Sequence, residues 1–358
     1  MRIALLLLPI LCIGNGCKHW ITSEDRAAST NEIARLRNHV RTPDNLSIQV
    51  TRSSEQISVR WRERLSPPHP VTVRLLPSDS FGSVQPVVEA RLNDGRVVPL
   101  VLDTGSPVNL LHMGVALKNS VPIADPDLMG TTFQGFGGFE PAYYGMIEQL
   151  SVGDMQFRHA LTAIRTRTFQ RRFLGMIPVF RWEGNLIGMS SLSKLKYLTI
   201  DYPTRSATFS ARQLFSEPTN HMAARLPFHL EGMQILVDLH LPPTNHVTAV
   251  VDTGNDAPLM LPTNLVRELG YQQLASKGQP GKYIGLGGQV HTRTFGLPQI
   301  KLGSLTFTRV DVVTAPEDYP VSIGSGLLKN YRVTIDFRQK VIWLERGPFG
   351  IPLAGRGM

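Results

Sequence analysis

Short apolar or alternating runs, separated by turn residues, recur along this chain. Residues 87–92 and 97–102 are two such runs, and the Asn-Asp-Gly sequence at 93–95 between them has the composition of a hairpin turn. Residues 235–241 and 247–251 repeat the arrangement around a Pro-Pro-Thr-Asn turn. The pattern therefore predicts paired strands rather than long helices.

Helical patterns are short and few. They are confined to residues 192–196, 264–269 and 325–329, with one more short helix expected at residues 31–40. Residues 48–52 and 57–62 alternate apolar and polar positions, as the strands of a hairpin do. The 26 prolines and 31 glycines of the 358-residue chain also favour strands and turns. The predicted fold class is all-β with few short helices.

Four blocks of sequence occur twice, in the same order. The first copies lie at residues 101–106, 135–138, 150–157 and 186–189, and the second copies at 250–255, 285–288, 300–307 and 322–325. Chance rarely produces four matching blocks in order, so we infer a duplicated unit. The last two blocks lie closer together in the second copy, which predicts an insertion in the first copy between residues 164 and 184.

The duplication divides the chain into five parts. Residues 1–16 are expected to be a signal peptide, 17–80 an N-terminal extension or spacer, 81–212 the first unit, 213–225 a linker, and 226–350 the second unit. The length agrees with about two domains. An anchor-proximal spacer, an accessory hairpin and a propeptide all remain open for the extension.

The N-terminus has the pattern of an export signal. Arg2 is followed by an apolar stretch at residues 3–13, then by Gly14, Asn15, Gly16 and Cys17. Cys17 stands where a bacterial lipoprotein carries its lipid-modified cysteine, although that motif usually has leucine in place of Gly14. We expect either an envelope-anchored lipoprotein tethered through Cys17 or a periplasmic or secreted protein cleaved near Gly16. Because Cys12 and Cys17 are the only cysteines, the mature domain has no internal disulfide.

The formal net charge of +9 does not by itself indicate a nucleic-acid partner. Basic residues are scattered, apart from a cluster of Arg165, Arg167, Arg171 and Arg172, and no aromatic-interleaved basic helix accompanies them. We expect this cluster to be a solvated basic loop. The ten histidines show no metal-like spacing, so neither a metal nor an organic cofactor is expected.

One Asp-Thr-Gly turn is weak evidence for chemistry, but this chain has two in matching positions. Each follows an apolar strand, and each precedes a Gly-rich hairpin and an apolar-Ile-Gly block. Over about residues 85–348 this combination resembles the aspartic peptidases, in particular two retropepsin-like units fused in tandem. The resemblance implies two β-barrel lobes related by a pseudo-twofold axis within a monomer. It also implies that Asp103 and Asp252 meet at that axis as the catalytic pair.

Hydrolysis without a covalent intermediate explains why two carboxyls are needed. A base must activate water while an acid polarises the carbonyl and protonates the leaving group. Two carboxyls about 3 Å apart cannot both ionise, so they share one proton and titrate as a unit. The residues alone assign no fixed role to either aspartate.

The neighbours of the aspartates have expected roles. Gly105 and Gly254 would let the backbone approach the carboxyls and supply amide donors. By resemblance, Thr104 and Thr253 interlock across the axis through hydroxyl-to-backbone hydrogen bonds, and the Ser106 hydroxyl donates to the outer oxygen of Asp103.

Other positions of the resemblance are less regular. Asn255 departs from the usual serine, threonine or alanine, which leaves the environment of the second carboxyl open. Asp256 is expected to have a structural role rather than to contact substrate, and Asp201 and Asp336 to end structural strands.

The Gly-rich turns are expected to be flaps over the substrate. Their candidate residues are Gly137 and Gly138 in the first unit and Gly287 and Gly288 in the second. Tyr143 or Tyr144 would either contact the site or pack in the core. The two Ile-Gly pairs, at 187–188 and 323–324, would brace the catalytic turns from behind.

These features together predict an exported aspartic endopeptidase that binds an extended peptide or protein substrate. The alternative is a catalytically silent peptide-binding protein on the same fold. A third interpretation, a structural lipoprotein of the envelope, would have no cleft.

Overall fold

The structure is a computed structural model of the chain. It describes residues 21–38, 40–41, 48–52, 57–61, 64–77, 83–93, 95–124, 130–173, 176–218, 223–243 and 245–346. The expected signal peptide at 1–16 and the lipidation candidate Cys17 lie outside these residues. Within the described residues no helix is both long and apolar enough to cross a membrane.

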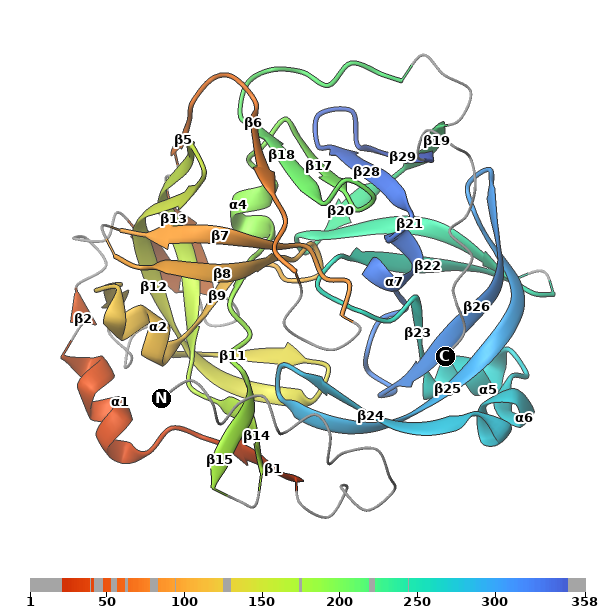
Figure 1. Ribbon diagram of the computed structural model, residues 1–358, viewed down its shortest axis with the longest axis horizontal. Helices are drawn as coiled ribbons and strands as arrows, with labels where there is room; N and C mark the ends of the chain where they lie inside the picture. Colours follow the sequence, from red (N-terminus) through yellow and green to blue (C-terminus); the bar gives the residue numbers. More distant parts are fainter. Residues whose placement is uncertain are drawn as a thin grey trace, which may run out of the picture.

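The first unit is built on a ten-stranded sheet (Figure 1). Its strands, in spatial order, are β2 (Val40–Arg41), β10 (Ile123–Ala124), β12 (Gly138–Val152), β7 (Val87–Leu92), β8 (Val97–Leu102), β16 (Leu186–Ile187), β9 (Asn109–His112), β13 (Met155–Arg165) and β5 (Arg64–Ser66), with β11 (Gly130–Gly135) paired to β12. The expected hairpin of residues 87–92 and 97–102 is β7 and β8. Alternate residues of β7 are buried, as its sequence pattern predicts.

The second unit repeats this arrangement in an eight-stranded sheet. The order is β20 (His229–Glu231), β21 (Gln234–Leu241), β22 (Asn245–Asp252), β27 (Ser322–Gly324), β23 (Leu259–Pro262), β26 (Leu305–Ala315), β25 (Gly288–Leu302) and β24 (Gln279–Gly285). The long hairpins β12–β13 and β25–β26 share one register, because Leu150 faces Phe157 in the first and Ile300 faces Phe307 in the second. The sequence duplication is therefore also a structural one.

A six-stranded sheet joins the two units. Its order is β19 (Ala223–Pro227), β29 (Val341–Arg346), β28 (Tyr331–Asp336), β17 (Tyr197–Asp201), β18 (Ser206–Ser210) and β6 (Val71–Arg74). Thr199 of β17 faces Thr334 of β28, and their hydroxyl oxygens lie 2.9 Å apart. These threonines are equivalent in the repeat, and a residue that pairs with its own equivalent lies on a twofold axis. The pseudo-twofold axis that the resemblance implies passes between them.

The predicted insertion forms a hairpin of its own. Strands β14 (Thr168–Phe173) and β15 (Ile177–Trp182) make a three-stranded sheet with β1 (Ile21–Arg26) of the N-terminal extension. The expected hairpin within residues 48–62 is also present, as β3 (Ile48–Arg52) paired with β4 (Ile57–Trp61). Figure 1 shows the three-stranded sheet below the first unit.

The helices are short, as expected, but two were missed. The described helices are α1 (Thr30–Arg37), α2 (Met113–Lys118), α4 (Met189–Leu192), α5 (Thr263–Glu268), α6 (Gln272–Lys277) and α7 (Ser325–Leu328). The sequence patterns indicated α5 but not α2 or α6, although all three have six residues, because fewer than two helical turns leave the period to a few positions. In α2 the helix start is stabilised by His112, whose Nδ1 accepts from the backbone N–H of Gly114 at 3.1 Å.

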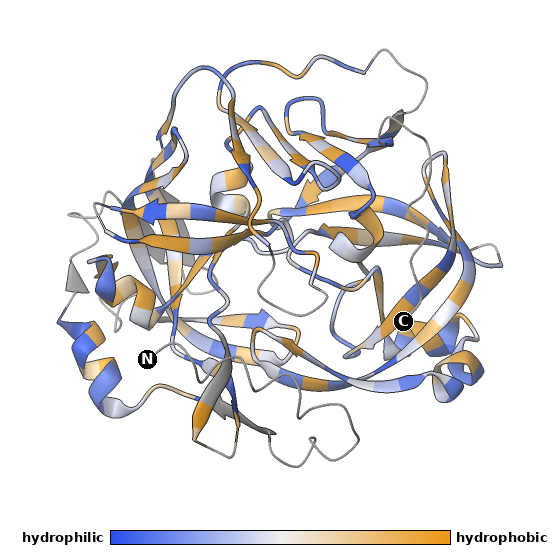
Figure 2. Ribbon diagram, viewed as in Figure 1, coloured by the Kyte–Doolittle hydropathy of each residue, from blue (hydrophilic) through white to orange (hydrophobic). Residues whose placement is uncertain are grey.

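Apolar side chains fill the interior between the sheets. Phe157 and Phe209 are fully buried and meet edge to face with centroids 6.4 Å apart. Figure 2 shows hydrophobic residues along the central strands and hydrophilic ones on α1 and α6 at the periphery. Strands β8 and β22 pack on this core, and the Asp-Thr-Gly turns begin at their C-terminal ends.

The expectation for the basic cluster was partly wrong. Arg165 is not solvated but only 3% exposed, at the end of β13, where it forms an ion pair with Glu140. An arginine is found in such a place only when a carboxylate compensates its charge. The sequence showed the charges of this region but not the partner.

Candidate active site

The two Asp-Thr-Gly turns follow β8 and β22 and are braced from behind. The backbone N–H of Asp103 donates to the carbonyl of Ile187 at 2.9 Å, and β16 runs parallel to β8. In the second unit β27 runs parallel to β22, with Asp252 facing Gly324. The two Ile-Gly pairs therefore lie where the sequence predicted them, behind the turns.

Thr104 and Thr253 interlock across the axis. The Thr104 hydroxyl donates to the carbonyl of Val251, and the Thr253 hydroxyl donates to that of Leu102, both at 2.6 Å. Each hydroxyl also accepts from the other threonine's backbone N–H at 3.1 Å. Both side chains are completely buried, so these four bonds hold the two turns against each other without competition from water.

We expect Thr253→Val to destabilise the protein by about 2–5 kcal/mol, because it leaves the Leu102 carbonyl and the Thr104 N–H buried without this partner. Thr253→Ser is the matched control, since it keeps the hydroxyl. Urea unfolding of the two variants measures the difference. Equal midpoints for valine and serine would show that the hydroxyl bonds contribute nothing.

The two glycines bring each turn against the opposite aspartate. A methyl group on Gly105 would overlap the carboxyl of Asp252, and one on Gly254 would overlap the carboxyl of Asp103. The two carboxyls are themselves hydrogen-bonded to each other. The structure thus brings together the two aspartates that the sequence singled out.

The surroundings of the two carboxyls differ. Burial raises the pKa of both above the ordinary value of 3.8, and the charge of Asp103 raises the pKa of Asp252 further. Oδ1 of Asp103 accepts from the N–H groups of Gly105 at 2.8 Å and Ser106 at 3.1 Å, whereas Oδ1 of Asp252 accepts from that of Gly254 at 3.0 Å. The shared proton is therefore favoured on Asp252 and the negative charge on Asp103.

Ser106 does not act as predicted. Its hydroxyl donates to the carbonyl of Val108 at 2.8 Å, and it is the backbone N–H of Ser106 that reaches Asp103. The side chain of Asn255 also serves the turn itself. Its amide donates to Ser322 at 3.1 Å, and its oxygen accepts from the N–H of Ala257 at 2.9 Å. A side chain that can close its own turn satisfies itself locally.

Asp256 holds the segment that leads into the first unit. Its Oδ1 accepts from the Ser83 hydroxyl at 2.7 Å and from the Val84 N–H at 2.9 Å. The Gln85 side chain donates to the Gly254 carbonyl nearby. The expected structural role of Asp256 agrees with these contacts. Asp336 likewise ends a strand, with Oδ1 accepting from two backbone N–H groups at 2.9 Å.

The tyrosine nearest the pair is one that the sequence did not single out. The Tyr319 hydroxyl lies close to Asp252, and burial, together with the charges of Asp252 and Asp103, raises the pKa of this phenol well above 10.0. Its ring packs edge to face on Phe136, with centroids 5.1 Å apart. Tyr143 packs against the core instead, and Tyr144 against Phe133. Only the tertiary fold brings Tyr319 to the site.

The two Gly-rich hairpins meet tip to tip, as Figure 1 shows for β11–β12 and β24–β25. The backbone N–H of Gly137 donates to the carbonyl of Leu286 at 2.7 Å. The Phe136 side chain is buried in the second unit against Tyr283 and Tyr319, and Leu286 packs into an apolar cluster of the first unit. Each tip thus places its apolar side chain in the opposite unit.

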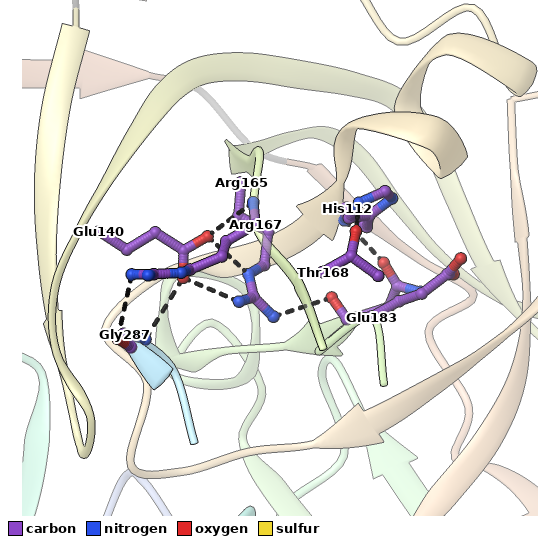
Figure 3. A network of polar contacts seen from close by, with 8 residues as sticks. His112, Glu140, Arg165, Arg167, Thr168, Glu183 and Gly287 are labelled. Atoms are coloured by element: carbon purple, nitrogen blue, oxygen red, sulfur yellow. Dashed lines mark hydrogen bonds and ion pairs between the residues drawn. The ribbon is translucent and has the colours of Figure 1, made fainter. Parts of the chain in front are cut away.

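A second set of contacts at the tips was also missed. Glu140, buried on β12, accepts from Arg165 and from the backbone of Arg167, and it also receives the N–H of Gly287 (Figure 3). Glu140 lies on β12 and Arg165 on β13, and the sequence pattern of neither strand indicates that the two charges meet. The described residues contain no group of three or more His, Cys, Asp or Glu that could hold a metal ion.

Residues 244–328 match the family model described as aspartyl protease. The matched stretch contains Asp252, the tip of the second hairpin and the Ile323-Gly324 pair. An aspartyl protease domain is therefore supported for the second unit. The first unit, with Asp103, lies outside the matched stretch. Among curated proteins, none matches this chain.

Proposed function

We propose that the protein is an exported aspartic endopeptidase whose catalytic pair is Asp103 and Asp252. The observation that carries the proposal is the reciprocal geometry of the turns, in which each carboxyl lies against the other turn's glycine and the two carboxyls share a hydrogen bond. A purely structural pair of turns has no need to bury two acids against each other, because their repulsion and desolvation cost stability.

The different surroundings of the carboxyls suggest a division of roles. Asp103, whose charge is stabilised by two amide donors, accepts a proton from the attacking water. Asp252 carries the shared proton and donates it toward the carbonyl oxygen of the scissile bond. As the tetrahedral intermediate collapses and the C–N bond breaks, Asp103 passes the proton taken from water to the leaving nitrogen, and a hydroxyl of the intermediate returns a proton to Asp252 as it becomes the new carbonyl oxygen. Since the pair titrates as one unit, a bound substrate can exchange these roles.

The hairpins would cover a substrate in extended conformation. Their glycine tips present backbone N–H and C=O groups, which recognise a peptide main chain irrespective of its sequence. Phe136, Tyr283 and Tyr319 line the second turn with aromatic surface. We therefore propose an unfolded protein segment or peptide as the substrate and a monomer as the active form.

The pH dependence of peptide turnover tests this function. Only the pair with one proton is active, so we expect a bell-shaped profile of kcat/KM. Both limbs should lie above pH 3.8, because the pKa of each carboxyl is raised. Mass-spectrometric mapping of cuts in a peptide library gives the activity at each pH. Tight binding of peptide and of pepstatin without any turnover would favour the silent peptide-binding protein instead.

We also propose export and a lipid tether, and both proposals rest on the sequence alone. The leader at residues 1–16 and the candidate Cys17 support passage out of the cytoplasm. Metabolic labelling with a radioactive fatty acid, compared between the natural chain and Cys17→Ser, decides between the tethered and the free form.

A further inference from the structure

The contacts that close the two hairpins are not equivalent. The carbonyl of Gly287 accepts from Nη1 of Arg167 at 3.2 Å, and its N–H donates to Oε2 of Glu140 at 3.3 Å. Both groups on the second tip belong to the backbone, while both partners are charged side chains of the first unit (Figure 3). The tip of the second hairpin is thus held by a polar socket.

The socket itself is fixed in the first unit. Glu140 and Arg165 are 2% and 3% exposed and form a two-pronged ion pair, with Nε and Nη2 of the arginine at 3.1 and 2.8 Å from the carboxylate. Arg165 also donates to the carbonyl of Glu183 at 3.1 Å. This pair ties β12, close to its hairpin tip, to the end of β13.

The second unit has no such pair. Because β12–β13 and β25–β26 share one register, the equivalents of Glu140 and Arg165 are Val290 and Ala315. These two residues pack in an apolar cluster and give no directional bond. The equivalent of Arg167 is Glu317, which has the opposite charge. The first hairpin is instead held to the second unit by an exposed hydrogen bond from the Gln134 side chain to Asp318, so only the second tip is held by a buried charged socket.

Opening of the second hairpin leaves the socket intact. When Gly287 withdraws, Glu140 keeps both bonds from Arg165 and the 3.0 Å bond from the backbone N–H of Arg167. No buried charge loses its partner, so the movement avoids the large cost of an uncompensated ion. The strand β24 at the outer edge of this hairpin is mostly exposed, so it offers little resistance.

We infer that Glu140, Arg165 and Arg167 form a one-sided latch, and that substrate enters by movement of the second hairpin while the first hairpin stays fixed. The entry of substrate in this inference rests on the proposed peptidase function, whereas the movement of the second hairpin can be tested without substrate. Arg167 is the positioning residue of the latch, because its side chain reaches the moving tip and contacts no reacting atom. Glu140 and Arg165 shape the socket.

Hydrogen exchange tests the latch without substrate. In Arg167→Met the Glu140–Arg165 pair and the Arg167 backbone contact remain, so the fold is retained. We expect amides of residues 279–290 to exchange about three- to tenfold faster, which corresponds to the loss of one hydrogen bond. The Gly137 amide should follow them, because its acceptor is the Leu286 carbonyl on the moving tip, and the other amides of residues 130–140 should be unchanged. Arg158→Met, which removes an exposed arginine from the far end of β13, is the matched control. Equal acceleration in both hairpins, or in neither, would overturn the latch.

Cross-linking tests which hairpin moves. Gln134 of the first hairpin and Asp318 of the second unit are exposed, and Nε2 of Gln134 donates to Oδ2 of Asp318 at 2.7 Å. In a chain with Cys12 and Cys17 changed to serine, Gln134→Cys with Asp318→Cys allows a short bismaleimide to pin the first hairpin. Turnover of the cross-linked protein should persist. The control is the same variant with both cysteines capped by N-ethylmaleimide, which forms no cross-link and should also retain turnover. Loss of turnover only in the cross-linked protein would show that the first hairpin must open.

The kinetic constants provide a readout that a general loss of stability does not give. The latch closes the second hairpin over bound peptide, so Arg167→Met should raise KM about three- to tenfold with little change in kcat. A fall of kcat alone would contradict a positioning role. If the natural protein shows no turnover at all, the proposed function fails, while the exchange experiment still decides the latch.

Discussion

Asp252→Asn is expected to lower kcat by about 10²–10⁴-fold while making the folded protein more stable at neutral pH. Asparagine keeps the shape of the side chain, but it cannot carry the proton that the pair shares. Asp103→Asn should cause a similar loss, because the base is then missing. An effect of this size in both variants is the signature of two groups that act as a unit.

The gain in stability follows from the raised pKa of Asp252. Burial and the charge of Asp103 place the pKa of the folded state well above 3.8, the value expected in the unfolded chain. Between these two values the folded state binds more protons, so its stability falls as the pH rises. Because asparagine does not titrate, the stability of Asp252→Asn does not fall with rising pH in the way that the stability of the natural protein does. The advantage of the variant should therefore be smallest below pH 3.8 and largest above the folded-state pKa.

Thermal unfolding of both proteins as a function of pH measures this effect, and peptide cleavage measures the loss of activity. Asp201→Asn is a suitable control, because Asp201 lies in the six-stranded sheet and caps a turn through Thr204. Full activity in either Asp103→Asn or Asp252→Asn would rule out the shared pair. A variant Asp252→Asn that is less stable at every pH would contradict the strained environment of the pair.

Gly105→Ala and Gly254→Ala are expected to produce the second-largest effect. The new methyl group would overlap the carboxyl of Asp252 or Asp103, with no flexible group able to give way. Overpacking of a rigid site costs about 1–3 kcal/mol or more. The turns would also separate, so peptide turnover should fall together with stability.

Gly296→Ala is the matched control, because a methyl group there would meet nothing within 4 Å and Gly296 lies in strand β25 rather than in a catalytic turn. Urea unfolding and cleavage of one reference peptide compare the three variants. Loss of activity without loss of stability in Gly105→Ala would mean that the turns move apart freely. Wild-type values in both measurements would show that the pair is not as close as the structure has it.

The sequence by itself determined the local elements and their duplication. Strand pairs such as 87–92 with 97–102 follow from alternation and turn chemistry, which act between neighbours along the chain. The repeat predicted which residues are equivalent. The resemblance to tandem retropepsin-like units then implied that Asp103 meets Asp252 and that Thr104 interlocks with Thr253, as the structure has them.

Only the tertiary structure decided what differs between the two copies. Glu140 and Arg165 pair because β12 and β13 bring together residues far apart in sequence, and Tyr319 reaches Asp252 from a loop of irregular sequence. Such contacts depend on the packing of whole strands, and no spacing along the chain records them. The Ser106 hydroxyl shows the same limit, because a nearby carbonyl competed successfully for it. Symmetry was readable from the sequence, whereas the asymmetry that distinguishes the two hairpins required the fold.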